Sequence, residues 1–296
     1  MIISDKLKAL LLVSAISFGA PALTQAQGLK TPVPSTLQKV SQGFALSEIN
    51  IEYSRPSAKG RTIFGDLVPY DKLWRTGANQ STKFTFGEDV QVAGKDLKAG
   101  TYAVYTIPGQ NEWKVLFYSD LKLGGNVAGY DKSKEVLSIT VPAKKTAESV
   151  ETFTISVANV TNTTADIDIT WANTKVTIPV STSIDEKVMA SIQDAMKDNK
   201  PYFQAAMYYF ENGKDLKQAY DWIQKAAEAN PNAFWILLNK AKIEHALGKH
   251  EEAIASATSC KVKATESKND DYVKMADQLI EHCREELKKQ GGTKKK

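Results

Sequence analysis

Histidine and cysteine are the scarcest reactive residues of this chain. Histidine occurs three times among 296 residues, at His245, His250 and His282. The first 244 residues therefore lack a histidine general base, a histidine-dependent catalytic triad and a histidine-ligated metal site. His245 and His250 stand five residues apart, whereas two ligands on one helical face stand four apart, and Gly248 interrupts the helix between them. We expect no metal site.

The two cysteines, Cys260 and Cys283, both lie in a region of helical periodicity. We expect antiparallel helices there, joined near Ser267. That arrangement separates the cysteines by on the order of 13 Å along the helix, beyond the roughly 7 Å between Cα atoms that a disulfide tolerates. We therefore predict two free thiols, and an intrachain disulfide is the alternative.

Several catalytic and cofactor motifs are also missing. The sequence contains no Gly-x-Ser-x-Gly nucleophile motif, no phosphate-binding glycine loop and no calcium-binding loop. Asp166 and Asp168 lie two apart on a predicted strand, a pattern more typical of a solvated strand face than of an acid–base pair. We expect no cofactor, assign no catalytic residue, and favour a binding function over an enzymatic one.

The composition is that of an ordinary globular protein, with 42% hydrophobic and 24% charged residues. A length of 296 residues predicts two domains. The formal net charge is +4, but the first 26 residues and the lysine-rich carboxyl terminus together carry more than this excess. The predicted folded body is slightly acidic, which argues against nucleic-acid binding.

Residues 1–26 have the pattern of a secretory signal peptide. Lys6 and Lys8 precede an apolar run over residues 10–18, and small residues with Thr24 and Ala26 follow it. The run is shorter than the roughly 20 residues that span a bilayer, so a retained membrane anchor is the weaker alternative. We expect export to the periplasm or the extracellular space, and no transmembrane segment in the mature chain.

Residues 27–182 have the pattern of a β domain. Short runs of alternating or β-branched residues are separated by glycine, proline and asparagine. No helical pattern intervenes, which predicts an antiparallel β-sandwich or a closed barrel. Two of these runs flank a short turn that we expect at Ala172 and Asn173. The predicted strands cover residues 45–53, 82–86, 90–93, 101–107, 113–118, 136–141, 151–160, 165–171 and 175–180.

Residues 183–290 change to helical periodicity. Ala219 and Ala253 occupy matching places in two similar segments, an offset of 34 residues that is the tetratricopeptide period. We expect a helix over 185–197, two tetratricopeptide-like helical hairpins, and a capping helix over 271–288. Such hairpins imply a protein or peptide partner. Residues 291–296 are expected to form a disordered lysine tail.

The segment from Tyr53 to Phe86 has neither helical nor strand periodicity and concentrates arginine, tryptophan, proline and glycine. Structured loops of this kind often carry sites. Guanidinium groups recognise carboxylates and phosphates, so we predict a pocket for an anionic or polyhydroxylated ligand. Tyr53 and Trp113 are further candidates for its floor. The candidate binding residues are Arg55, Lys59, Arg61, Tyr70, Trp74, Arg75 and Asn79.

A structural interpretation of the same residues stays open, and we prefer it. The arginines would pair with Asp66, Asp71 and Glu88 as clamps, because ion-paired arginines commonly serve the scaffold. The tryptophans would belong to the core. Gly77 and Asn79 would supply backbone positions with positive φ.

Six segments carry a resemblance to a known family. They are YSRPSAKGRTIFG, LVPY, LWRTGAN, AGTYAVYTIPG, GYDKSKEVLSITV and ITWANTKVTIPV. Together they resemble the bacterial family known as domain of unknown function 2911, over roughly residues 37–180. The resemblance implies an exported β domain, often followed by helical repeats. It brings no established activity and therefore identifies no catalytic residue.

Two functional hypotheses follow. The first is an exported, non-enzymatic binding or scaffold protein, with a loop-built pocket on the β domain and a helical region for a partner. The alternative is a histidine-independent hydrolase or lyase that acts on a glycan or cell-envelope substrate. That enzyme would use Asp66 or Asp71 beside Arg75.

Overall fold

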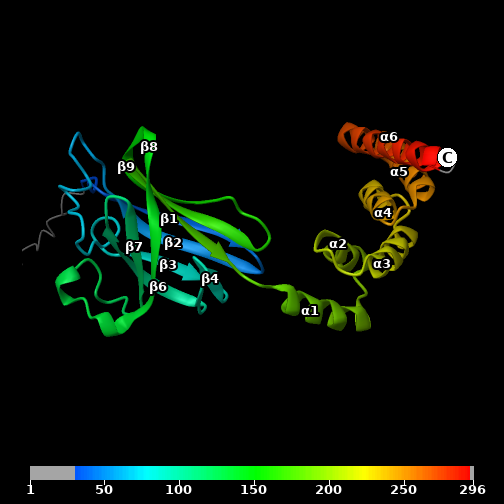
Figure 1. The fold of residues 1–296 in the computed structure, drawn as a ribbon. Coiled ribbons are helices and arrows are strands. Elements are labelled where there is room, and N and C mark those ends of the chain that lie inside the picture. The colour runs from blue at the N-terminus through cyan, green and yellow to red at the C-terminus, as the bar shows by residue number, and fades with distance from the viewer. Residues whose placement is uncertain (1–30, 294–296) are drawn as a thin grey trace, which may run out of the picture.

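The computed structural model describes residues 31–293, and of 291–293 only the helical backbone. The predicted signal peptide and the last three lysines lie outside the described residues. Nine strands come first in the chain and six helices follow them, so the described residues form a β domain and a helical region (Figure 1). The predicted class, an antiparallel β domain followed by helical hairpins, is confirmed.

The strands form one antiparallel sheet in the order β1-β2-β3-β6-β7-β8-β9-β4-β5. β1 and β5 are the two ends of this order, so the described sheet is folded rather than closed into a barrel. The strands are β1 Thr36–Phe44, β2 Ser47–Arg55, β3 Thr82–Phe86, β4 Val90–Val92, β5 Lys95–Leu97, β6 Gly100–Pro108, β7 Glu112–Tyr118, β8 Glu135–Ala158 and β9 Thr164–Ser181.

β8 folds the sheet into two layers. Its first part, Glu135 to Pro142, pairs with β7, and the part from Ala143 to Ala158 pairs with β9. The register shifts on either side of Val150, and such irregularities let a strand bend without ending. The prediction of separate strands over 136–141 and 151–160 is therefore wrong, because one continuous strand passes from one layer to the other.

β9 is likewise one strand where the sequence predicted two. Ala172 has φ +48° inside the strand, so the residues expected to form a hairpin turn form a local irregularity instead. Asp168 also differs from expectation. Its side chain is buried, accepts a hydrogen bond from Thr177 Oγ1 at 2.6 Å and pairs with Lys175 at 2.8 Å. It is a structural carboxylate rather than part of a solvated face.

β1 was not predicted from the sequence, and the reason is physical. It is an edge strand, TLQKVSQGF, in which Phe44 is the only fully buried side chain. The other inward positions are half-buried and mostly polar, so the alternation of large apolar residues that identifies a strand is absent.

The core of the β domain lies between the two layers. Ile49, Ile51 and Tyr53 of β2 are buried in the same cluster as Phe153 of β8 and Trp171 of β9. Tyr53 also bridges the layers with its hydroxyl group, which accepts a hydrogen bond from Ile155 N at 2.8 Å and lies 3.0 Å from Ile155 O. A side chain of β2 thereby satisfies the backbone of β8, which β2 does not pair with as a strand.

From α2 onward, the helices after the sheet pack as successive antiparallel neighbours. α2 contacts α3, α4 contacts α5, and α6 covers α5 and α4. Gly213 and Gly248, between the helices of each pair, have φ of +61° and +75°, in the left-handed region that favours glycine. No helix within residues 31–293 is long and apolar enough to cross a membrane. The helices are α1 Asp185–Asp198, α2 Tyr202–Glu211, α3 Leu216–Ala229, α4 Phe234–Ala246, α5 His250–Glu266 and α6 Asp270–Thr293.

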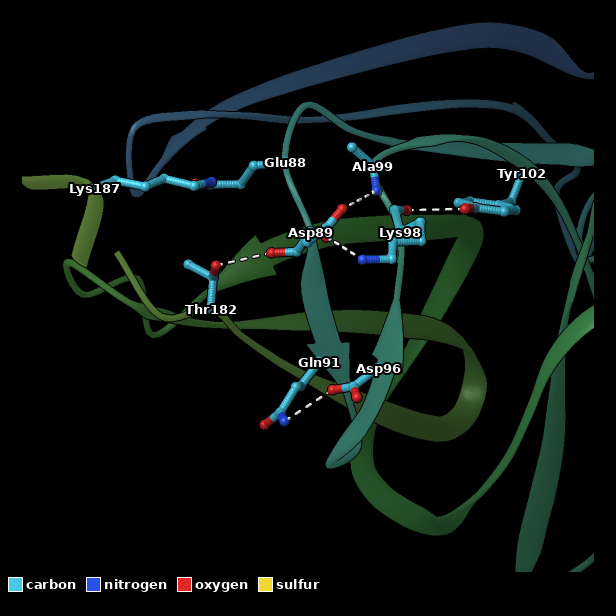
Figure 2. A network of polar contacts seen from close by, with 9 residues as sticks. All are labelled: Glu88, Asp89, Gln91, Asp96, Lys98, Ala99, Tyr102, Thr182 and Lys187. Atoms are coloured by element: carbon cyan, nitrogen blue, oxygen red, sulfur yellow. Dashed lines mark hydrogen bonds and ion pairs between the residues drawn. The ribbon is translucent and has the colours of Figure 1, made fainter. Parts of the chain in front are cut away.

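Glu88, in the turn between β3 and β4, connects the β domain to α1. Its buried side chain accepts a hydrogen bond from Leu46 N at 3.2 Å and pairs with Lys187 of α1 at 3.2 Å (Figure 2). Glu88 was expected to clamp an arginine of the loop. It instead pairs with Lys187 at the junction between the β domain and the helices.

The neighbouring Asp89 organises the same turn. Its carboxylate accepts hydrogen bonds from Lys98 Nζ at 2.7 Å and from Ala99 N at 2.9 Å, and its carbonyl accepts one from Thr182 Oγ1 at 2.9 Å (Figure 2). The bond from Lys98 and then the bond from Ala99 hold the pKa of Asp89 below its usual value. The segment that leads to α1 is thus attached to the β3–β4 turn.

The Tyr53 bridge gives a test of how the two layers are held. Replacing Tyr53 by Phe keeps the ring but leaves backbone groups of Ile155 without their partner. We predict a loss of about 1–3 kcal/mol in the free energy of unfolding, measured by equilibrium urea unfolding. Tyr70→Phe is the matched control, because the structure records no hydrogen bond from that hydroxyl, and we expect a change within about 0.5 kcal/mol. Equal stability of Tyr53→Phe and wild type would show that the bridge is dispensable.

Candidate functional site

The segment between β2 and β3, residues 56–81, crosses one end of the folded sheet as a structured loop. One of its attachment points to the sheet is Trp74, whose backbone pairs with Thr106 of β6. Trp74 N donates to Thr106 O at 2.7 Å, and Thr106 N donates to Trp74 O at 2.9 Å. These two bonds fix the course of the residues that follow, Arg75 to Asn79.

The Trp74 ring belongs to an aromatic cluster that joins the loop to both layers. It stacks on Trp171 of β9 with ring centroids 6.0 Å apart and planes 17° apart, and it meets Phe153 of β8 and Trp113 of β7 edge to face. Its Nε1 donates to Gly77 O at 3.1 Å. Trp113 is fully buried and belongs to the core, as the structural interpretation held.

A cavity of about 440 Å³ lies between this loop and the segment that precedes β1. Asn79 Nδ2 closes one side by donating to Ser35 O at 3.2 Å and to Ser54 Oγ at 3.3 Å. Trp171, which the sequence analysis did not single out, also lines the cavity. Five of the seven candidate residues line it, namely Lys59, Arg61, Trp74, Arg75 and Asn79.

The other two candidates lie outside the cavity lining. Arg55 Nε donates to Phe153 O at 3.0 Å and its Nη2 donates to Thr154 Oγ1 at 2.8 Å, so this arginine ties β2 to β8. Tyr70 packs closely over Gly65, where an added Cβ would lie 2.7 Å from the ring. Arg55 and Tyr70 are therefore structural residues of the loop and its neighbours.

The arginines of the cavity bind backbone carbonyls rather than carboxylates. Arg61 donates to Ala58 O at 2.9 Å and to Ser57 O at 2.6 Å. Arg75 Nη1 donates to Asn79 O at 3.1 Å. These bonds brace the turns, so the arginines are clamps, but within residues 31–293 the ion pairs that we predicted with acidic partners are not formed.

The positions of the acidic residues explain this outcome. Asp66 and Asp71 are exposed and make no side-chain hydrogen bond or ion pair with the described chain, and Glu88 pairs with Lys187. The carboxylate of Glu151 accepts a hydrogen bond from Lys59 N at 2.8 Å but does not line the cavity.

The cavity therefore carries positive charge that no described carboxylate neutralises. Lys59, Arg61 and Arg75 are its charged lining residues. A guanidinium group has five N–H donors, and the bonds to carbonyls occupy only some of them. Arg61 Nη1 and Arg75 Nη2 make no hydrogen bond within the described residues. This arrangement can hold a carboxylate or phosphate group of a ligand.

The backbone beside Arg75 is strained. Thr76 is buried with φ +55°, a region that β-branched residues rarely adopt. Its Oγ1 donates to Thr106 Oγ1 at 3.1 Å, and its carbonyl accepts a bond from Thr82 Oγ1. Asn79 and Gly77 have φ of +59° and +144°, as the structural interpretation expected. Strained backbone that its surroundings hold in place is common at binding sites.

A second cavity, of about 370 Å³, lies between the β1–β2 turn and helices α1 and α2. Its lining residues, which include Leu46, Ile184 and Val188, contain no charged side chain. Its polar lining residues are all neutral, so it has no charged group to recognise an ionic ligand, and we take the cavity at Arg75, which contains most of the predicted residues, as the candidate functional site.

Residues 35–180 match the model of a family described as a protein of unknown function (DUF2911). The match spans the β domain and ends before the helices, so it supports the resemblance of that domain and leaves the tetratricopeptide-like character of the helices as a prediction. Comparisons of the chain with curated proteins and with solved structures return no match.

Gly77 allows a test of the loop geometry. Its φ of +144° disfavours any side chain, and an added Cβ would lie 2.9 Å from Ser54 O. We predict that Gly77→Ala lowers the free energy of unfolding by about 3 kcal/mol, because the close contact adds to the backbone strain.

Gly60→Ala is the matched control for this substitution. Gly60 has φ +71° and nothing within 4 Å of an added Cβ, so we expect a loss of about 1 kcal/mol. Urea unfolding measures both variants. Equal losses for the two would mean that the contact of Gly77 with Ser54 does not constrain the loop.

Proposed function

We propose that this chain is an exported binding protein for an anionic saccharide. The proposal proceeds from the premise that the β domain belongs to a family of unknown function. The ligand would lie in the cavity between Trp74, Trp171 and Arg75. The observation that carries the proposal is the set of three cationic side chains that line this cavity and have no carboxylate partner in the described chain.

The chemistry of the lining residues indicates the ligand class. Arg61 and Arg75 offer donors for a carboxylate or phosphate group. The half-buried indole ring of Trp74 offers an apolar surface, for which the C–H face of a sugar ring is a natural partner, and the buried ring of Trp171 supports it by stacking. A volume of about 440 Å³ falls within the usual range for small-ligand sites, about 300–1,000 Å³, and suits a short saccharide.

The same lining favours binding over catalysis. The enzymatic alternative assigned its acid or base to Asp66 or Asp71, and a carboxylate in that role must contact the substrate. The lining residues include no aspartate or glutamate, and Asp66 and Asp71, which the alternative required, are not among them. We therefore prefer the non-enzymatic hypothesis.

Export remains part of the proposal, and the amino-terminal sequence supports it. Lys6 and Lys8 followed by the apolar run over residues 10–18 have the signal-peptide pattern, although these residues lie outside the described structure. A periplasmic or extracellular location would expose the protein to saccharides of the cell envelope.

We further propose that the helical hairpins are tetratricopeptide-like and contact a protein or peptide partner. Ala219 and Ala253 are fully buried at equivalent places near the starts of α3 and α5, in keeping with the 34-residue offset. Each of these helices follows a left-handed glycine, Gly213 or Gly248. Stacked hairpins of this type usually present a binding surface.

Arginine variants test the proposed site directly. We predict that the wild-type chain binds galacturonate di- and trisaccharides but not their neutral galactose counterparts. Arg75→Ala and Arg61→Ala should each weaken binding by about 10- to 100-fold, because each removes charged hydrogen-bond donors. Isothermal titration calorimetry measures the affinity, which should also fall as the salt concentration rises.

Arg55→Ala is the matched control. It removes an arginine of the same segment whose guanidinium group bonds Phe153 and Thr154 outside the cavity. We expect lower stability but an affinity within about twofold of wild type, since it contributes no donor to the cavity. If Arg55→Ala weakened binding as much as Arg75→Ala, or if neutral and anionic saccharides bound alike, the proposed site would be rejected.

A further inference from the structure

The three histidines and one of the two cysteines gather at one corner of the helical region. His245 lies in the last turn of α4, His250 is the first residue of α5, and His282 and Cys283 lie in α6. The three helices pack against one another (Figure 1). All three histidines of the chain therefore lie close together, although they belong to three separate helices.

The side-chain atoms converge closely. His245 Nδ1 lies 3.1 Å from His250 Nδ1 and 3.4 Å from Cys283 Sγ. One ligand atom from each of the three residues lies within 4.8 Å of the others. Zinc bonds of about 2.1 Å to nitrogen and 2.3 Å to sulfur, in tetrahedral geometry, place neighbouring ligand atoms roughly 3.3–3.6 Å apart. Two of the separations, 3.1 Å and 3.4 Å, are close to that arrangement, and a small shift of the His250 or Cys283 side chain would bring the third pair, which lies within 4.8 Å, to ligand spacing.

Hydrogen bonding alone accounts poorly for the same contacts. A neutral imidazole nitrogen either carries one proton or offers one lone pair. His245 Nδ1 faces both the His250 ring and the Cys283 thiol. Its single proton or lone pair cannot form a good hydrogen bond with each of them. A cation at the centre would accept electron pairs from all three groups at once.

The surroundings favour a buried cation. Cys283 is fully buried and His250 is only 7% exposed. Glu244, the residue before His245, is also buried. Lys240 Nζ lies 3.0 Å from Glu244 Oε1, but neither carboxylate oxygen accepts a well-formed hydrogen bond. Lys240 therefore offsets the charge of this buried carboxylate, whose two oxygens keep capacity to accept hydrogen bonds next to His245.

We propose that His245, His250 and Cys283 form a binding site for a divalent transition-metal ion of the zinc type. Two imidazoles and a thiolate are the ligands that such ions prefer, whereas magnesium and calcium prefer oxygen. The fourth position would take water or His282, whose ring centroid lies 4.8 Å from that of His245. The ion would join α4, α5 and α6 at the end of the helical region.

The spacing of the histidines argued against a metal site, because the four-residue rule applies only to ligands on one face of a single helix. The turn between α4 and α5, in which Gly248 has φ +75°, reverses the chain and turns His245 toward His250. Cys283 then arrives from α6, far along the chain. Spacing along one helix could not reveal a site built at the meeting point of three.

Metal titration of the full chain, prepared without a polyhistidine tag and stripped with chelator, tests the proposal. We expect one Zn²⁺ bound per chain, measured by competition with a chromophoric chelator. His250→Gln and Cys283→Ser should each weaken Zn²⁺ binding by more than about 100-fold, the upper end of what loss of an outer-shell partner costs. Cobalt in place of zinc should give the near-ultraviolet charge-transfer band of a cobalt–thiolate bond.

Cys260→Ser is the matched control, because Cys260 is equally buried but lies outside the cluster. It should keep the Zn²⁺ affinity and the cobalt–thiolate band, and Cys283→Ser should lose both. If a ligand variant fails to fold, the wild-type chain still decides through its stoichiometry and its cobalt–thiolate band. Absence of that band, or Zn²⁺ binding that survives in both His250→Gln and Cys283→Ser, would overturn the proposal.

Discussion

The double hydrogen bond between Trp74 and Thr106, together with the packing of the Trp74 ring, is the constraint on which the candidate site depends. The backbone bonds attach the loop to β6, and the ring reaches Trp171 of β9 and Phe153 of β8. One residue thus ties the loop to both layers of the folded sheet. Arg75 follows it directly, so the guanidinium group is placed by the same contacts that hold the domain together.

The bonds of the arginines also determine the charge of the cavity. An arginine that pairs with a carboxylate braces a structure and neutralises itself, whereas Arg61 and Arg75 brace their turns through carbonyl oxygens. A carbonyl satisfies a donor without cancelling the positive charge. The two interpretations that the sequence left open are therefore compatible: these arginines brace their turns, and we propose that they also bind an anion.

Local patterns predicted several strands and the helical region, but they missed β1 and divided β8 and β9, because contacts between distant residues decide those features. β3 and β7 follow from alternation that is visible within a few residues. The irregularities at Val150 and Ala172 resemble turns in sequence, although the strands continue through them, because the paired neighbour decides whether a strand ends. Trp171 was missed as a cavity residue for the same reason, since its neighbour Trp74 is remote in the chain.

The most direct test of the central claim, that the cavity at Arg75 receives an anionic saccharide, is nuclear magnetic resonance of the indole N–H groups during titration with a galacturonate trisaccharide. Trp74 and Trp171 line the cavity, whereas Trp113 is buried in the core and Trp222 and Trp235 belong to the helices. We predict saturable shifts of the Trp74 and Trp171 signals with little change in the helical two. Unchanged signals for Trp74 and Trp171, or equal shifts with the neutral saccharide, would contradict it.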